Sequence, residues 1–86
     1  MRILILNPKD NVGTALQDLP EGSWINGILL RENIPFGFKT ALSDIGEGDK
    51  IIKYGEPIGI ALTRISAGEL VHVHNIQGIR GRGDLL

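Results

Sequence analysis

The chain contains two histidines, His72 and His74, and these residues are the best suited to metal or proton chemistry. They lie in an apolar stretch, residues 70–74, that predicts a β-strand. Side chains alternate between the two faces of a strand, so both imidazoles would share one face while Val71 and Val73 face the core. Two imidazoles suit a first-row divalent ion but do not complete a site. The competing interpretation is an exposed polar strand face.

Other polar residues are candidates for binding a substrate. Asp10 and Asn11 lie in a loop of turn-forming residues, 7–11, and would offer oxygens to a metal or a polyol hydroxyl if they converge with groups from elsewhere. The simpler interpretation, which we favour, is a loop whose side chains bond to their own backbone. Lys39 and Asn75 are further candidates.

Lys53 and Tyr54 place a cation and a phenol directly before a predicted turn. A turn flanked by an aromatic side chain is the simpler explanation of this pair.

The composition argues against several classes of function. The 86 residues suffice for one small domain, and the net charge of −1 comes without a basic run, so we expect no nucleic-acid partner. The chain has no cysteine and no Gly-x-Ser-x-Gly segment, so a self-sufficient hydrolase is not expected. Its N-terminal apolar run is too short for a signal segment or a membrane span. We expect no membrane partner and a cytoplasmic location.

An internal repeat indicates the fold class. Its three copies are residues 14–22, 40–48 and 61–68. In each copy a large aliphatic residue is expected in the core and a glycine in the turn, where a positive φ favours glycine. The aliphatic residues are Leu19, Ile45 and Ile65, and the glycines are Gly22, Gly48 and Gly68.

The repeat and the density of glycine predict a compact all-β domain of short strands and glycine turns. The expected strands are residues 24–30, 50–53, 57–62 and 70–74, with a further strand at 1–6 that is buried on both faces. Residues 39–45 fit one helical turn or a strand, and we favour the strand. The domain is expected to span residues 1–77, followed by a Gly/Arg-rich tail or linker, 78–86, where a second domain would be attached.

Seven segments together have a specific order and spacing, and they cover nearly the whole chain. They are Asp10-Asn11-Val12, Gly37-Phe38-Lys39, Asp44-Ile45, Ile52-Lys53-Tyr54-Gly55, Pro57-Ile58-Gly59, Gly68-Glu69 and Val71-His72-Val73-His74-Asn75. In these segments the chain resembles the N-terminal SAF-type module of altronate dehydratases and the small subunit of sulfolactate sulfo-lyases. Galactarate dehydratase is a more distant likeness. This resemblance implies a β-clip fold.

The resemblance also implies an activity. It is that of a metal-dependent carbon–oxygen lyase that dehydrates a sugar acid such as altronate, with this chain as the small subunit or module beside a larger catalytic subunit. Iron(II) or manganese(II) is the implied ion, held mainly by the larger subunit. A metal that holds the carboxylate and hydroxyl would stabilise the enediolate formed when the α proton leaves.

On this basis we assign roles to the candidate residues. The catalytic set is Lys39, His72 and His74, of which the two histidines would also ligate metal; the substrate-binding set is Asp10, Asn11, Lys53 and Asn75. Phe38 departs from the family, which usually has histidine there, and this favours the alternative of a non-catalytic binding or stabilising module. The small subunit of a sulfolactate sulfo-lyase is another alternative, and self-association into a homo-oligomer stays open.

Overall fold

The structure, a computed structural model, describes residues 2–79 and is built from short strands. Residues 2–78 contain no α-helix, so the predicted all-β fold is confirmed. The strands are β1 (Ile3–Leu4), β2 (Val12–Ala15), β3 (Trp24–Ile25), β4 (Ile28–Leu29), β5 (Lys39–Ala41), β6 (Lys50–Lys53), β7 (Glu56–Ala61), β8 (Leu70–Val71) and β9 (Ile76–Gly78). Nothing in the described part of the chain forms a helix of the length and apolarity needed to cross a membrane.

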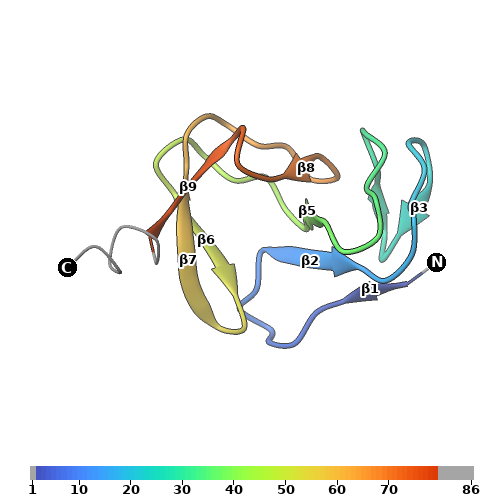
Figure 1. Cartoon of the computed structure of the whole chain (residues 1–86), viewed down its shortest axis with the longest axis horizontal. Helices are drawn as coiled ribbons and strands as arrows, with labels where there is room; N and C mark the ends of the chain where they lie inside the picture. The colour runs from blue at the N-terminus through green and yellow to red at the C-terminus, as the bar shows by residue number, and fades with distance from the viewer. Residues whose placement is uncertain (1, 80–86) are drawn as a thin grey trace.

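The strands form three small antiparallel sheets (Figure 1). The largest has the order β1-β2-β5-β8, and the other two are the hairpin β3-β4 and the sheet β6-β7-β9. Figure 1 shows the β3-β4 hairpin at one end of the molecule and β6, β7 and β9 at the other, with the four-stranded sheet between them.

The repeat that predicted the fold has four copies in the structure, one more than the sequence analysis found. Each copy has a buried residue, a buried Leu or Ile four positions later, and a glycine three positions after that. The copies are Ala15/Leu19/Gly22, Leu30/Ile34/Gly37, Ala41/Ile45/Gly48 and Ala61/Ile65/Gly68. All four glycines have φ between 85° and 89°, which confirms the expected turn role.

The four copies associate as two reciprocal pairs. In the first pair, Leu19 and Ile34 each donate a backbone N–H to the other's carbonyl at 2.8 Å. In the second pair, Ile45 and Ile65 do the same at 2.7 and 2.8 Å. Each pair has its own apolar cluster, so the core consists of two adjoining clusters. We call these the first-pair cluster and the second-pair cluster.

Three of the predicted strands differ from those observed, and the strand predicted over residues 70–74, which ends at Val71, is described with the site below. Residues 24–30 form the hairpin β3-β4 rather than one strand, because Asn26 and Gly27 adopt φ values of 51° and 76° and turn the chain back. An Asn-Gly pair between apolar residues is the usual signal for such a tight hairpin. Residues 1–6 were expected to be buried on both faces, but β1 is an edge strand and Leu6 is 58% exposed.

The remaining predicted elements agree more closely. Residues 39–45 begin with a strand, β5, as favoured, and β6 has the predicted bounds. The tail expected at 78–86 overlaps the described chain at Gly78, which belongs to β9, while residues 80–86 lie outside the described part.

Candidate functional site

Lys39 is the first residue of β5 and lies between two neighbouring strands. It pairs with Thr14 of β2 and with Val71 of β8. The flanking backbone bonds, Ala15 N–H to Phe38 O and Leu42 N–H to Asn11 O, make Thr14 and Lys39 a non-hydrogen-bonded pair, in which side chains approach most closely.

The ammonium group of Lys39 is in an unfavourable electrostatic environment. Partial burial, and secondarily the positive charge of Lys53, lower the pKa of Lys39 below its ordinary value. No ion pair to Lys39 occurs within residues 2–79, where the one salt bridge is Arg64 to Asp44. Lys39 and Lys53 therefore form a small cationic area, in which the charge of Lys53 disfavours the charged form of Lys39.

Lys53 is positioned by the tight hairpin between β6 and β7. Tyr54 and Gly55 adopt φ values of 57° and 76°, which is the conformation of a two-residue hairpin turn. The Lys53 Nζ atom lies 4.7 Å from the centroid of the Tyr54 ring, a cation–π contact. The aromatic side chain thus contacts the cation in addition to flanking the turn.

The two loop residues assigned to substrate binding instead tie this hairpin to β2. Asp10 Oδ1 accepts the Gly55 N–H at 2.8 Å. Asn11 Oδ1 accepts the Ile52 N–H at 2.7 Å, while its Nδ2 donates to the Lys50 carbonyl at 2.9 Å. Both side chains bond to the backbone of a distant hairpin rather than to that of their own loop, so the simpler interpretation is wrong for these two residues. These bonds fix the position of Lys53 relative to β2.

The strand predicted over residues 70–74 ends at Val71, and residues 72–75 form a turn instead. The reason given for placing both histidines on one strand face is therefore wrong. Val73, expected in the core, is 76% exposed, and both His72 and His74 are exposed.

Asn75 closes this turn from inside the protein. It is only 7% exposed, its Oδ1 accepts the His72 N–H at 3.0 Å, and its Nδ2 donates to the Leu70 carbonyl at 2.8 Å. Its backbone N–H donates to the His72 carbonyl as well. The side-chain amide is thus engaged in holding the turn that presents His72 and His74.

The structure does not bring Lys39 and His72 to the same side of the sheet. The His72 ring contacts the Phe38 ring at a centroid distance of 4.9 Å, and Phe38 packs against the first-pair cluster. Lys39 follows Phe38 directly and therefore points to the opposite face, which it shares with Val71 of the second-pair cluster. Of the assigned residues, Lys39 and Lys53 come together, and His72 and His74 share a separate turn.

The donor set within the described part of the chain does not amount to a metal site. Within residues 2–79, no third His, Cys, Asp or Glu joins His72 and His74 in a group able to hold an ion. A catalytic metal commonly has three protein ligands. The residues described therefore do not fit a complete iron(II) or manganese(II) site.

Sequence reasoning missed two features. The first is Thr14, whose Oγ1 is buried beside Lys39 without a hydrogen-bond partner in the described structure. No local pattern signals such an atom. The second is a pocket of about 490 Å³ between the first two copies of the repeat. The identical spacing in Leu19-Pro20-x-Gly22 and Ile34-Pro35-x-Gly37 was a signal that would have found the missing copy.

The family is decided by comparison with known proteins. Residues 1–78 match the family described as the altronate/galactarate dehydratase SAF domain. The chain belongs to this family. The SAF domain is 44% identical over 79 residues to altronate dehydratase of Escherichia coli K12, a match that covers 87% of this chain and 16% of that protein.

Two other relatives differ from each other in how much of their length this chain matches. Altronate dehydratase of Bacillus subtilis 168 is 43% identical over 74 residues, covering 81% of this chain and 15% of the relative. The alpha subunit of (2R)-sulfolactate sulfo-lyase from Chromohalobacter salexigens is 42% identical over 48 residues, covering 56% of this chain and 51% of the subunit. The SAF domain thus spans about one sixth of the dehydratases but about half of the sulfo-lyase subunit.

Proposed function

We propose that this SAF domain is the accessory module of a metal-dependent carbon–oxygen lyase that dehydrates a sugar acid such as altronate. It would act in the cytoplasm with a larger polypeptide that carries most of the active site. The observation that supports this most is the match to altronate dehydratase, which covers 87% of this chain and only 16% of that enzyme. Most of such an enzyme is therefore outside the matched segment.

The metal, iron(II) or manganese(II), is assigned in this proposal to the larger polypeptide. The two histidines fall short of a ligand set, and no further ligand joins them in the described structure. We assign His72 and His74 to the surface that faces the larger polypeptide, because both are exposed on a turn held by Asn75.

The cationic area of Lys39 and Lys53 is proposed to bind the carboxylate of the acid. The two neighbouring ammonium groups repel one another, and a carboxylate between them would relieve that repulsion. Removal of the α proton spreads negative charge onto the carboxylate, so fixed cations stabilise that state more than the ground state. In this proposal we assign Lys39 to turnover and Lys53 to substrate binding.

A second candidate is supported by the sulfo-lyase match, in which the related protein is itself a subunit rather than a segment of a long chain. The acid would then be a sulfolactate and the leaving group sulfite. The same cationic area would serve, because sulfolactate also carries a carboxylate.

A third candidate, a non-catalytic stabilising module, is favoured by the Phe38–His72 contact. The side chain at the family's usual histidine position packs against a ring and the core, and it cannot transfer a proton.

Reconstitution tests these candidates. The chain is produced alone and together with the larger dehydratase-like polypeptide of its source, and each sample is given iron(II) or manganese(II) with altronate, galactarate or sulfolactate. We expect the pair to dehydrate altronate and the isolated chain to be inactive. Release of sulfite would favour the sulfo-lyase. Equal activity of the larger polypeptide with and without this chain would favour the stabilising module.

A further inference from the structure

The two pairs of repeat copies differ at one equivalent position, and this difference points to a binding site. In the second pair, Asp44 precedes Ile45 and Arg64 precedes Ile65. Asp44 Oδ1 accepts the Ala67 N–H at 2.9 Å, and its Oδ2 accepts Arg64 Nη2 at 3.0 Å. A backbone amide and a guanidinium group thus occupy the two oxygens of this carboxylate.

In the first pair the equivalent carboxylate, that of Asp18, has no guanidinium partner within residues 2–79. Asp18 precedes Leu19, and its Oδ1 accepts the Phe36 N–H at 2.8 Å, as Asp44 accepts that of Ala67. The position of Arg64 is taken by Asn33, whose Oδ1 accepts the Glu21 N–H at 2.8 Å. Within residues 2–79, no group donates to Asp18 Oδ2.

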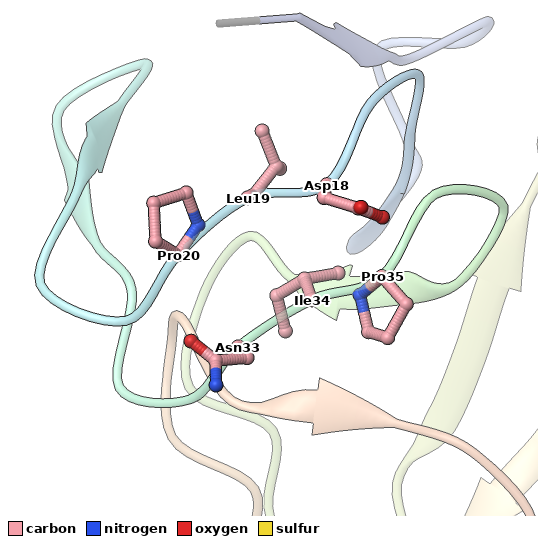
Figure 2. A pocket seen from close by; sticks show the side chains of 6 residues that line it. All are labelled: Asp18, Leu19, Pro20, Asn33, Ile34 and Pro35. Carbon is pink, nitrogen blue, oxygen red and sulfur yellow. The ribbon is translucent and has the colours of Figure 1, made fainter.

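The pocket missed by sequence reasoning is lined by both Asp18 and Asn33 (Figure 2). Its volume is about 490 Å³, within the usual range for ligand pockets. Figure 2 shows two segments side by side, with the Asp18 carboxylate beside Pro35 and the Asn33 amide on the side of Pro20. The lining residues are Asp18, Leu19, Pro20, Asn33, Ile34 and Pro35.

The walls fit a side chain that has an apolar stem and a cationic end. Proline has no N–H and offers mainly carbon surface, so the polar groups of a guest would be met by Asp18 and the Asn33 amide. The Phe36 ring, directly after Pro35, is 65% exposed, and an exposed aromatic face attracts a cation. Arginine combines a carbon stem with a planar group that pairs with a carboxylate through two hydrogen bonds.

We propose that this pocket receives an arginine side chain from the larger polypeptide, whose guanidinium group pairs with Asp18 as Arg64 pairs with Asp44. The choice of the larger polypeptide as the partner rests on the function proposed above. The match to altronate dehydratase covers only 16% of that enzyme, so in that proposal most of the enzyme is available to contact this domain. The cation preference of the pocket does not rest on that function.

Binding of a small arginine derivative tests the cation preference without any lyase activity. The nitrogen-15-labelled chain is titrated with N-acetyl-arginine amide, and the amide signals of Phe36 and Glu21 are followed by NMR. We expect saturable shifts with this probe and none with N-acetyl-citrulline amide, which has a similar shape but no charge. Equal shifts with both probes, or no saturable shift with the arginine probe, would overturn the proposal.

Three variants locate the effect. Asp18→Asn keeps an oxygen for the Phe36 N–H and removes the charge, so arginine binding should weaken by about tenfold or more. Asn33→Arg should form an internal pair with Asp18, abolish probe binding and leave the fold intact. Asp44→Asn is the matched control in the second pair, where Arg64 already occupies the carboxylate, and it should not change binding at Phe36. Unaltered binding in Asp18→Asn would place the probe elsewhere and reject the site.

Two further comparisons address the partner. Tighter binding of free arginine than of the blocked amide would indicate a small-molecule site and overturn the docking assignment. In the reconstituted pair, Asn33→Arg should weaken association with the larger polypeptide by about tenfold or more, since the pocket is then filled. Unchanged association together with probe binding at Asp18 would also overturn the docking assignment while leaving the lyase proposal standing.

Discussion

Lys39 is the residue at which charge and burial conflict most clearly. Burial and the charge of Lys53 lower its pKa in the folded protein, so the unfolded chain binds more protons at pH values between that lowered pKa and 10.5. Stability of the parent protein therefore rises as the pH increases through this window. A residue that destabilises the fold at neutral pH is well explained by a role in binding.

We expect Lys39→Met to be more stable than the parent at neutral pH and to lack this rise in stability at alkaline pH. The measurement is urea unfolding at neutral pH and near pH 10. Lys50→Met, which removes an exposed lysine of β6, is the matched control and should behave as the parent does. A lower stability of Lys39→Met at neutral pH would show that the ammonium group has a stabilising partner.

Phe38, where the resemblance described above implied a histidine, is a packing residue. Its ring contacts His72 and lies against the first-pair cluster. We expect Phe38→His to lower the free energy of unfolding by about 1–2 kcal/mol through lost apolar contact. Phe36→His, at an exposed ring, should cost less than about 0.5 kcal/mol.

Phe38→His also tests whether residue 38 lies near the active site. In the reconstituted pair, turnover or its pH profile should change, since a well-placed acid–base group is typically worth about 10²–10⁴ in rate. If both are indistinguishable from those of the parent pair, the loop is remote from the active site and the stabilising-module candidate gains support.

At the scale of elements, the repeat turns depend on glycine for two separable reasons. Gly22 and Gly68 both have positive φ, but a Cβ at Gly22 would meet open space whereas one at Gly68 would overlap the carbonyl oxygen of Leu29. We expect Gly22→Ala to cost about 1–2 kcal/mol from backbone strain. Gly68→Ala should cost a further 1–3 kcal/mol, roughly, from the overlap. Equal losses by chemical denaturation would contradict the close approach of the Leu29 carbonyl to Gly68.

In the turn of residues 72–75, the buried Asn75 and the exposed His72 and His74 are expected to have different roles. Asn75→Ala removes bonds to His72 and Leu70 and should destabilise the protein by about 2 kcal/mol. The double variant His72→Gln/His74→Gln should cost about 1 kcal/mol or less but reduce turnover of the reconstituted pair. Thermal unfolding and steady-state kinetics measure the two effects. A collapse of stability in the double variant would show that the histidines are structural.

At the scale of the whole molecule, the small size of the domain and its incomplete site predict tight association with a larger polypeptide. A stable interface of that kind buries roughly 1,200–2,000 Å² in total. We expect the co-produced chains to elute as one complex in size-exclusion chromatography with light scattering. Elution of this chain alone as a symmetric oligomer, with the larger polypeptide separate, would instead favour self-association.

The sequence by itself determined the fold class, because the repeat is local: the glycines needed for positive φ and the aliphatic residues of the core recur at fixed spacing. It also determined the family, since each segment that carries the likeness is a short continuous run and the order and spacing of the segments can be read from the sequence. The hairpin at Asn26 and Gly27 was within reach of the same reasoning, because its turn chemistry is local too.

Only the tertiary structure decided how the candidate residues are grouped. The alternation argument for His72 and His74 failed because Asn75, through its side-chain bonds to Leu70 and His72, holds a turn where the apolar pattern predicted a strand. Asp10 bonds to a hairpin 45 positions away, and the pocket at Asp18 exists because two repeat copies pair reciprocally. Such contacts depend on which distant backbone groups meet, and a pattern within one segment carries no information about that.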